Sequence, residues 1–429
     1  MRTFWFAVYN LIGVPLIWLF FNLYSLFNSK VREGLRERRD LFNLLNRSLS
    51  SFRDKKRKRI IIHSSSLGEY QQALPLVEEL RNKNYNIILS FFSPSGYNNS
   101  NINYPEVIKT YIPLDSVYNV KKFLDLTDPE IIIFMRYDLW FNLLYEAKKR
   151  KIRTVLANSR YDELDRTWSI PVISSFRKTL YGMLDIIFAI DDQDEINYRK
   201  KLGRENVEII RTGDSKFERV YQSAKKEFTE EFFPKEIIKD KKIFVIGSSW
   251  KDDEDVILPA VDKALLFNKD LLTMLVPHEP KETKLEAIER SIASSYGNIR
   301  TIRYSDIIRY KDENLIIIDR IGLLSKLYSL AYLSYVGGGF KTGLHNILEP
   351  AIFKMPIMFS NEVKNSDEDE ILLKYGCGIL ISDSRHFYRY LRTFLDNKKL
   401  RDETGEKCSF VFKDSVGIAE KIVRRITAE

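Results

Sequence analysis

The chain has 429 residues, 44% hydrophobic and 30% charged, which is typical of a folded globular enzyme and excludes a disordered chain. This length predicts two domains, each large enough to bury its own core. The net charge is +9, and the only two cysteines, Cys377 and Cys408, exclude a disulfide framework and fit a reducing compartment. The four histidines are too scattered to propose a metal site from their spacing.

The first predicted element is an apolar helix near the N-terminus. Residues Phe4 to Phe27 carry no charge, and about 20 such residues are enough to cross a bilayer as a helix. The segment lacks the short apolar core and the small-residue cleavage site of a secretory signal peptide. We expect residues 1–30 to be a membrane anchor. The sequence leaves open whether this helix spans the bilayer or lies in one leaflet.

Basic residues gather after this helix, whereas only Arg2 precedes it. The positive-inside tendency therefore predicts that the rest of the chain lies in the cytoplasm, tethered to the inner membrane. Anionic lipid headgroups attract each lysine or arginine by about 1 kcal/mol, so we expect an anionic membrane surface as a partner. A merely solvated face is the alternative. Nucleic acid is a weaker candidate, because its binding surfaces interleave basic residues with exposed aromatic ones.

Beyond residue 58, short β-branched strands alternate with helical stretches, which predicts an α/β fold with parallel, doubly wound sheets. The predicted strands of the first half are Arg59 to His63, Asn86 to Phe91, Ile131 to Phe134, Thr154 to Ala157, Ile186 to Ala189 and Val207 to Ile210. Those of the second half are Lys242 to Gly247, Leu271 to Val276, Ile299 to Ile302, Leu315 to Ile318, Leu333 to Val336, Ile357 to Phe359 and Gly378 to Ile381. The asparagine-rich stretch Tyr97 to Tyr104 is predicted to be a surface loop.

A segment rich in Lys, Glu and Phe, residues 218–240, separates the two sets of strands. We therefore expect an N-terminal Rossmann-like domain over residues 31–225 and a C-terminal one over residues 226–429. Ligands of such sheets bind beyond the carboxyl ends of the strands, which we expect to face a central cleft.

The segment His63-Ser-Ser-Ser-Leu-Gly-Glu-Tyr70 follows the first predicted strand and leads into a helix. Glu69 is therefore expected near a helix N-terminus, and small residues such as Ser66 and Gly68 let a ligand approach. A carboxylate at this place can accept a proton from a hydroxyl nucleophile. The structural alternative is a serine N-cap with a glutamate that serves the helix dipole.

Three more polar segments follow strands of the first half. They contain Asp138 (with Asn142 in the same segment), Arg160 and Lys216. Arg160 is a candidate for holding a carboxylate or phosphate. For each segment, helix capping or a simple turn explains the residues equally well.

The most informative part of the second half is Tyr335 to Pro356: a buried strand, a triple-glycine turn, the His345-Asn346 pair and a helix carrying Glu349. Glycines at a strand-to-helix turn let backbone amides approach an anion, and the helix N-terminus adds partial positive charge. A carboxylate in that helix can bind ribose hydroxyls. The segment thus predicts a nucleotide-sugar site; a tight turn in an ordinary α/β unit is the alternative.

Two other strand ends of the second half carry residues suited to an anion. Ser248 and Ser249 could wrap a phosphate, and His278 could contact a base or phosphate or belong to a capped turn. No GxxxxGK[ST], HExxH or GxSxG motif occurs at a suitable place, so an ATPase, a zinc protease and a serine hydrolase lose support.

In their order along essentially the whole chain, these segments resemble the 3-deoxy-D-manno-octulosonic acid (Kdo) transferase family of lipopolysaccharide synthesis. The resemblance implies a GT-B fold and an inverting transfer from CMP-Kdo to a lipid A precursor (lipid IVA), with no metal and no cofactor beyond the CMP-Kdo substrate. It implies that Glu69 is the general base. The implied donor-binding residues are Ser248, Ser249, His278, Gly338, Gly339, Asn346 and Glu349.

The chain departs from the family pattern at two places. Arg136-Tyr-Asp138 stands where many members have Glu-x-Glu, so an acidic role there rests on Asp138 alone. Val276-Pro-His278 lacks the arginine of the common Val-Pro-Arg-His segment, which puts one phosphate contact in doubt. Two alternatives therefore stay open: a GT-B transferase that uses another nucleotide sugar, such as a UDP-hexose, on a glycolipid, and a membrane-tethered scaffold with a decayed site.

Overall fold

The computed structural model describes residues 1–102, 104–162, 165–203, 205–225, 232–340, 343–362, 368–413 and 415–428. These residues form two compact units, Met1–Arg219 with Gly417–Glu429, and Val220–Val416. The predicted domain boundary at 225/226 adjoins residues 226–231, and Lys341 and Thr342 belong to the glycine-rich segment; both stretches lie outside the described residues.

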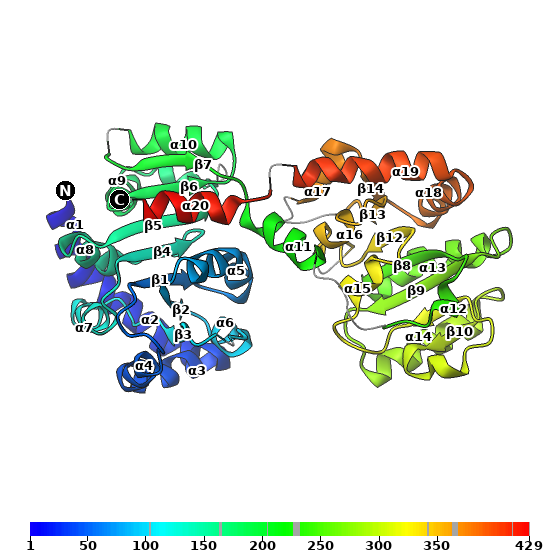
Figure 1. Cartoon of the computed structure of the whole chain (residues 1–429), viewed down its shortest axis with the longest axis horizontal. Helices are drawn as coiled ribbons and strands as arrows, with labels where there is room; N and C mark the ends of the chain where they lie inside the picture. Colours follow the sequence, from blue (N-terminus) through cyan, green and yellow to red (C-terminus); the bar gives the residue numbers. More distant parts are fainter. Residues whose placement is uncertain are drawn as a thin grey trace. The chain divides into compact units, whose positions relative to one another are not determined.

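The first unit is built on a parallel seven-stranded sheet in the order β3-β2-β1-β4-β5-β6-β7 (Figure 1). The strands are β1 (Arg59–Ser64), β2 (Asn86–Phe91), β3 (Val107–Tyr111), β4 (Ile131–Met135), β5 (Arg153–Ser159), β6 (Ile186–Ala189) and β7 (Glu208–Arg211). Helices that cover this sheet are α4 (Leu41–Ser50), α5 (Leu67–Asn82), α6 (Pro94–Asn99), α7 (Val117–Thr127), α8 (Phe141–Lys149), α9 (Pro171–Tyr181), α10 (Asp192–Leu202) and α20 (Ile418–Thr427), with short turns η2 (Arg38–Asp40) and η3 (Arg166–Ser169). α11 (Ser215–Lys225) begins in the first unit and ends in the second.

The second unit has its own parallel seven-stranded sheet, in the order β10-β11-β9-β8-β12-β13-β14. The strands are β8 (Lys242–Ser249), β9 (Leu271–Pro277), β10 (Thr301–Arg303), β11 (Leu315–Ile317), β12 (Leu333–Val336), β13 (Ile357–Ser360) and β14 (Gly378–Ile381). The helices are α12 (Lys235–Ile238), α13 (Lys251–Ala264), α14 (Glu282–Ser295), α15 (Leu324–Tyr328), α16 (Leu348–Ala351), α17 (Glu368–Tyr375), α18 (Ser384–Asp396) and α19 (Lys398–Glu406), with turns η4 (Tyr304–Arg309) and η5 (Lys407–Phe412).

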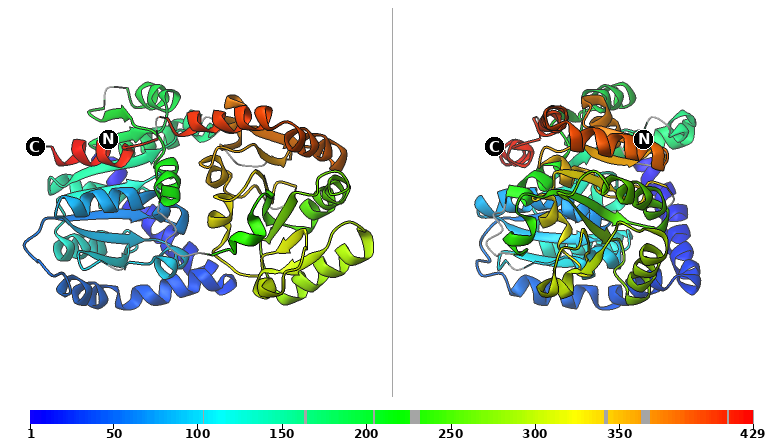
Figure 2. Two further views of the ribbon diagram at one scale, coloured as in Figure 1. Left: turned by 45° about the vertical axis from the view of Figure 1, so that its right-hand side comes forward. Right: turned by 90° about the vertical axis from the view of Figure 1, so that its right-hand side faces the viewer.

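In both units helices cover the two faces of the sheet, as the views of Figure 2 show. A parallel strand covered on both sides must be apolar on both sides, and β1, β2 and β4 are accordingly runs of isoleucine and other large residues. All residues of β2 and β4 are buried. The predicted doubly wound sheets are therefore present.

The C-terminal helix α20 belongs to the first unit, although the sequence analysis assigned residues 226–429 to the second domain. Its apolar residues are buried in the same core as those of α5 and β1 (Ile418, Ala419, Ile422, Val423 and Ile426). The Glu218 carboxylate accepts the backbone N–H groups of Gly417 (3.0 Å) and Ala419 (2.8 Å), which fixes the start of the helix.

The prediction missed strand β3 and placed a loop over Tyr97 to Tyr104, whose first residues form the second half of α6. Ser93 caps α6 and Pro94 occupies its first turn, so two ordinary helix-start signals precede the asparagine-rich stretch. Tyr97 of α6 stacks on Tyr111 of β3, with ring centroids 4.3 Å apart. β3 lies at the edge of its sheet, and its central Lys109 interrupts the apolar run that marks the other strands.

Near the N-terminus, α1 (Arg2–Val8), the π-helical turn η1 (Tyr9–Gly13) and α2 (Val14–Phe27) form one helix, which is followed by α3 (Ser29–Glu37). Residues Arg2–Phe27 are the one helix among the described residues that is long and apolar enough to cross a membrane. Its role as an anchor remains a prediction.

The strand order of each sheet reverses at one place. In the first sheet β1 lies beside β4, and in the second β8 lies beside β12, so later strands extend the sheet on opposite sides of each pair, with β11 lying between β9 and β10 in the second sheet. A crevice opens beyond the carboxyl ends of the strands at such a switch point, and ligands of open α/β sheets bind there. The loops after β1, β4, β8 and β12 are those that carry most of the predicted site residues.

Candidate functional site

Glu69 lies in the first turn of α5, directly after β1. The Ser66 hydroxyl accepts the Glu69 backbone N–H (3.3 Å) as the N-cap of the helix. The Glu69 carboxylate turns back and accepts the Ser65 backbone N–H (2.5 Å) and the Ser65 hydroxyl (2.9 Å). The predicted helix cap is therefore present, and the two Ser65 hydrogen bonds hold the carboxylate in one position.

The surroundings of Glu69 push its pKa in opposite directions. Burial has the largest effect and raises the pKa above its ordinary value of 4.5, because the residue is only 9% exposed. The two Ser65 hydrogen bonds lower it, the charge of Asp138 raises it and His63 lowers it. The net shift is upward, as a general base that works near neutral pH requires.

His63, the fifth residue of β1, is completely buried beside Glu69. Its Nε2 lies 2.9 Å from Oδ2 of Asp138, and its Nδ1 lies 3.0 Å from the Ser90 hydroxyl. Nδ1 also lies 3.1 Å from the Ser90 carbonyl oxygen, so the ring is held on both sides, and in the tautomer that carries its proton on Nε2 it donates to Asp138. The sequence analysis gave His63 no role, although a histidine inside a buried strand is itself a signal, since it needs polar partners.

A second hydrogen-bonded group connects the other predicted strand ends of the first unit. Gln72 Oε1 accepts from Asn158 Nδ2 (2.8 Å) and Arg136 Nε (3.1 Å), and Asn158 Oδ1 accepts the Ser215 backbone N–H (2.8 Å). Arg136 and Asn158 both adopt positive φ angles, 63° and 56°, at the ends of β4 and β5. Gln72, one helical turn after Glu69, was not predicted, but the position of Glu69 implies that the next turn faces the same edge.

The remaining predicted residues of the first unit are spread around this edge. Gly68 is exposed. Arg160 follows β5, and its charge opposes the rise that burial causes in the pKa of Asp194. Lys216 lies in the first turn of α11, where its backbone N–H donates to Asp214 (2.7 Å). The Asn142 side chain exchanges hydrogen bonds with Asn10 of the N-terminal helix and donates to the Asp115 carbonyl oxygen (2.6 Å).

In the second unit the triple-glycine turn follows β12. Gly338 has a φ of +94°, which favours glycine. A Cβ atom on Gly337 would lie 2.6 Å from the Ser248 carbonyl oxygen, so the turn packs against the end of β8 through its backbone. A Cβ on Gly339 would lie 2.7 Å from that of Ser360 in β13. The glycines bring three strand ends together.

Asp253, in the first turn of α13, organises this turn and was missed by the sequence analysis. Its Oδ2 accepts the backbone N–H groups of Gly338 and Trp250, both at 2.9 Å, and its Oδ1 accepts the buried Tyr335 hydroxyl at 2.8 Å. The Gly338 amide that was expected to meet an anionic ligand therefore donates to this carboxylate. Burial raises the Asp253 pKa, and these hydrogen bonds lower it.

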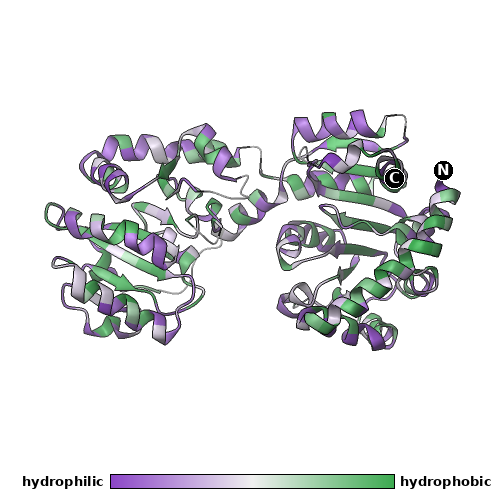
Figure 3. Ribbon diagram, turned by 180° about the vertical axis from the view of Figure 1, so that it is seen from behind, coloured by the Kyte–Doolittle hydropathy of each residue, from purple (hydrophilic) through white to green (hydrophobic). Residues whose placement is uncertain are grey.

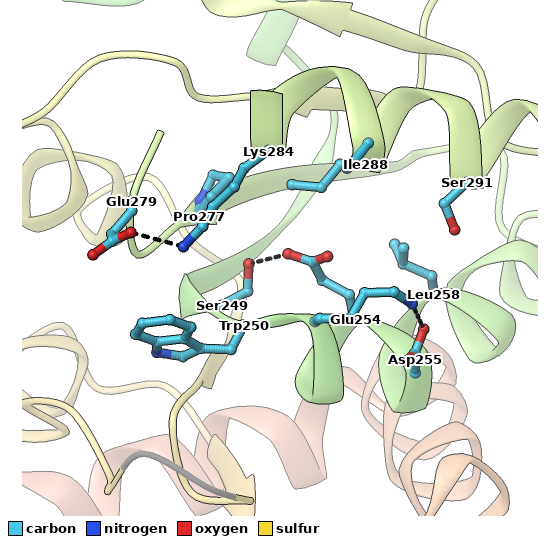
Figure 4. Close-up of a pocket in the computed structure, with 12 residues that line it drawn as sticks. Ser249, Trp250, Glu254, Asp255, Leu258, Pro277, Glu279, Lys284, Ile288 and Ser291 are labelled. Carbon is cyan, nitrogen blue, oxygen red and sulfur yellow. Dashed lines mark hydrogen bonds and ion pairs between the residues drawn. The ribbon is translucent and has the colours of Figure 1, made fainter. Parts of the chain in front are cut away.

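Ser248 and Ser249 end β8 and differ in their surroundings. Ser248 adopts a positive φ of 53° and is partly exposed. Ser249 is buried, and its hydroxyl donates to Oε1 of Glu254 (2.9 Å), as Figure 4 shows. The Ser249 hydroxyl is thus already paired with a carboxylate, whereas Ser248 is partly exposed at the strand end.

Three flat side chains stack beside the glycine turn. The ring centroids of Trp250 and His278 are 4.7 Å apart, and those of His278 and His345 are 4.3 Å apart. Trp250 Nε1–H donates to His345 Nε2 (3.2 Å), and the Lys284 ammonium lies 4.8 Å from the Trp250 ring centre. Burial lowers the pKa of His345, and His278 lowers it further. The stack joins the ends of β8 and β9 to the segment after β12.

Asn346 and Glu349 form a hydrogen-bonded pair, with Asn346 Nδ2 donating to Oε1 of Glu349 (3.1 Å). Asn346 is exposed, and burial raises the pKa of Glu349. Glu349 lies in α16, so the predicted order of turn, His-Asn pair and helix is found among the described residues of this segment.

A cavity of about 200 Å³ lies between α13 and α14 (Figure 4). Ser249, Trp250, Glu254 and Lys284 line it together with apolar residues such as Leu258 and Ile288. The residues of the glycine turn do not line it. Lys284 forms an ion pair with Glu279 at its edge, 2.7 Å apart.

Comparison with known proteins agrees with this picture. Residues 34–219 match the family model described as 3-Deoxy-D-manno-octulosonic-acid transferase (kdotransferase). A 3-deoxy-D-manno-octulosonic acid transferase of Haemophilus influenzae is 26% identical over 431 residues, which cover 99% of this chain and 97% of that protein. A bifunctional glycosyltransferase/methyltransferase of Fusobacterium nucleatum is 28% identical over 412 residues; they cover 92% of this chain but only 61% of that protein.

Among solved structures, UDP-GlcNAc 2-epimerase from Neisseria meningitidis is similar in fold, with a TM-score of 0.57 and 10% identity over 86% of this chain and 99% of that one. With the two parallel sheets, such neighbours confirm the predicted GT-B fold class.

Proposed function

We propose that the chain, which is similar to Kdo transferases over residues 34–219 and in full-length relatives, is itself a Kdo transferase and moves Kdo from CMP-Kdo to the lipid A precursor lipid IVA. The proposed reaction inverts the anomeric centre and uses no metal ion or further cofactor. The observation that carries it is the buried Glu69 carboxylate, held by Ser65 at the switch point of the first sheet beside the His63–Asp138 pair.

In the proposed mechanism the acceptor hydroxyl gives its proton to Glu69 while its oxygen forms a bond to the anomeric carbon of Kdo. The bond from that carbon to the phosphate oxygen breaks, and CMP leaves with the electron pair. Burial supports this role, because it raises the pKa of Glu69 and makes the carboxylate a stronger base. Ser66, Gly68, Asp138, Arg160 and Lys216 are proposed as the acceptor side.

The second unit is proposed to hold the donor. CMP-Kdo carries a phosphate and a carboxylate, so hydrogen-bond donors of the protein must stabilise the negative charge that develops on the leaving CMP. The Gly338 amide already donates to Asp253, so other groups must supply these hydrogen bonds. We propose the stacked His278 and His345 and the partly exposed Ser248 for this role. Ser249, Gly338 and Gly339 shape the turn, and Asn346 and Glu349 are proposed to bind the ribose.

The N-terminal helix is proposed to tether both units to the cytoplasmic face of the inner membrane, where the lipid acceptor is found. An uncharged helix followed by basic residues supports this location.

The central test combines purified protein, CMP-Kdo generated in situ and tetraacylated lipid A precursor, with products counted by mass spectrometry. Glu69→Gln should lower the transfer rate by about 10²- to 10⁴-fold and leave CMP-Kdo binding nearly intact. Glu78→Gln, on the same helix, is the matched control and should transfer at the normal rate. Near-normal turnover by Glu69→Gln would show that Glu69 is not the general base.

A panel of nucleotide sugars tests the donor separately. CMP-Kdo should raise the melting temperature of the protein, whereas UDP-hexoses should not. If only a UDP-hexose raised the melting temperature, the alternative transferase would be favoured. The missing arginine near His278 is the departure from the family pattern that motivates this alternative.

A further inference from the structure

One side of the N-terminal helix is fixed to the first unit by polar contacts. Asn10 and Asn142 exchange two hydrogen bonds, 2.9 and 2.8 Å long, and Asn142 is completely buried. Trp5 Nε1–H donates to the Ser175 hydroxyl (3.1 Å), and the Arg2 guanidinium donates to the Gly182 carbonyl oxygen (3.0 Å). These bonds connect α1 and η1 to α8 and α9.

Buried groups of the first unit depend on this contact. The Tyr9 hydroxyl is hydrogen-bonded to Asp115, which also accepts the backbone N–H groups of Asn142 (2.8 Å) and Leu143 (3.0 Å) at the start of α8. The Phe6 ring stacks on Tyr145 at 4.4 Å, and farther along Phe21 meets Phe92 at 5.4 Å. The helix therefore lies along the side of the unit over most of its length.

The opposite side of the same helix is apolar and uncovered. The large apolar side chains of this helix that are exposed, by 44% to 87%, are Phe4, Leu11, Ile12, Leu16, Trp18, Leu19, Phe20, Leu23, Tyr24, Leu26 and Phe27. In Figure 3 the helix is drawn in the green of apolar residues from its start near the N label. No charged residue lies between Arg2 and Lys30.

Cations lie at both ends of this apolar surface. Arg2 is at the start, and Arg32 donates to the carbonyl oxygens of Ser25 (2.9 Å) and Leu26 (2.8 Å) at the end of α2. Lys30 and Arg36 follow on α3. An apolar surface with cations at both ends matches one leaflet of an anionic bilayer, whose headgroups lie above its acyl chains.

An upright, membrane-spanning helix conflicts with these contacts. If α1 stayed docked, α8 and α9 would enter the bilayer with Lys148, Lys149 and Lys178, and charged side chains are costly there. If α1 left the unit, buried Asn142 and Asp115 would each lose a hydrogen-bond partner. A helix that lies flat in one leaflet meets neither cost.

We infer that Arg2–Phe27 is an in-plane anchor, which stays docked on the first unit and inserts its exposed side into the acyl-chain region of one leaflet of an anionic bilayer. This inference rests on the membrane tether of the proposed function and specifies its geometry. It places both ends of the helix on the same side of the membrane.

The depth of the helix in a bilayer tests the inference without any transferase assay. Full-length protein carrying Leu11→Cys, Leu19→Cys or Leu23→Cys is labelled with an environment-sensitive fluorophore and bound to phosphatidylethanolamine–phosphatidylglycerol vesicles. Cys377 and Cys408 are fully buried, so background labelling is low. Lipids with quenchers at two depths then locate each label.

An in-plane helix places all three labels at one shallow depth. An upright helix separates Leu11 from Leu23 by about 18 Å along the membrane normal, at 1.5 Å per residue. Such a gradient, or failure of the protein to bind these vesicles, would overturn the inference. Kdo transfer to a detergent-dispersed acceptor would still decide the proposed function independently.

Two asparagines of the helix provide a matched pair of variants. Asn10→Leu removes the bonds to Asn142, whereas Asn22→Leu removes only a local bond to the Trp18 carbonyl oxygen. We expect Asn10→Leu to lower the melting temperature of vesicle-bound protein and to increase the depth of the Leu11 label. Asn22→Leu should change neither. Equal behaviour of the two variants would contradict the docked helix.

Discussion

The Glu69 carboxyl group is held by hydrogen bonds that lower its pKa and by burial that raises it. Because burial has the larger effect, the acid limb of the pH–activity profile should lie above the ordinary glutamate value of 4.5, with activity rising as the carboxyl group loses its proton. Ser65→Ala removes the hydroxyl that donates to Glu69, which takes away one of the lowering contributions. The acid limb of kcat/KM should therefore move to higher pH in this variant.

Ser95→Ala offers a control, since that hydroxyl contacts only Ser93 in the loop after β2. Its profile should match that of the unchanged protein. An acid limb that Ser65→Ala leaves in place, or moves downward, would count against Glu69 as the titrating base.

Asp253 is the residue on which the glycine turn of the second unit depends. Asp253→Ala leaves the Gly338 and Trp250 amides and the buried Tyr335 hydroxyl without their acceptor. We expect a loss of about 2–4 kcal/mol in the free energy of unfolding, because buried unpaired donors are costly. Urea titration followed by circular dichroism measures it.

The neighbouring Asp255 forms only an exposed ion pair with Lys251, so Asp255→Ala should cost about 0–1 kcal/mol. A similar loss in both variants would show that Asp253 stabilises the helix alone and not the turn.

Among the elements, the start of α8 is tied to the N-terminal helix through Asp115. Burial raises the pKa of Asp115 to about 7 from its ordinary value of 3.8, although the bonds from Asn142, Leu143 and Tyr9 lower it. Between these two pH values the folded chain holds a proton that the unfolded chain has released. Stability should therefore fall as the pH rises through this range, by at most about 4 kcal/mol from this group.

Asp115→Asn is neutral throughout this range and removes that contribution. Melting temperatures measured from pH 4 to pH 8 should fall less steeply in the variant than in the unchanged protein. Parallel curves would mean that Asp115 is ionised in the folded chain.

The sequence predicted most elements because buried parallel strands are largely apolar runs, as in β4. It missed β3 because an edge strand tolerates a lysine such as Lys109. The strand-end motifs led to Glu69, whereas Gln72, one helical turn later, and Asp253, in the first turn of α13, have partners that the local sequence does not reveal. Their roles depend on contacts with residues about 85 positions away along the chain.

At the scale of the whole molecule, the first unit is completed by the last helix of the chain. α20 supplies Ile422 and its apolar neighbours to the core that also contains β1 and α5. Ile422→Asp places a charge in that core and should destabilise the first unit by about 3 kcal/mol or more, leaving the second unit folded. Limited proteolysis with mass spectrometry of the fragments identifies the unit that opens.

Ile196→Asp, at an exposed position of α10 in the same unit, is the control and should leave the cleavage pattern unchanged. Cleavage first within residues 232–413 of Ile422→Asp would contradict the assignment of α20 to the first unit.

The return of α20 also has a consequence for synthesis on the ribosome. The polypeptide for β1 to β7 emerges early, but α20, which shares one face of this sheet with α5, is translated only after the second unit, roughly 10 to 40 s later at usual rates of elongation. During that interval part of an apolar face of the nascent first unit is uncovered, while the second unit can already fold around its own sheet. Folding is therefore expected to finish in the reverse of the order in which the two sheets are made, and a fragment that stops after β7 should need a chaperone to remain soluble.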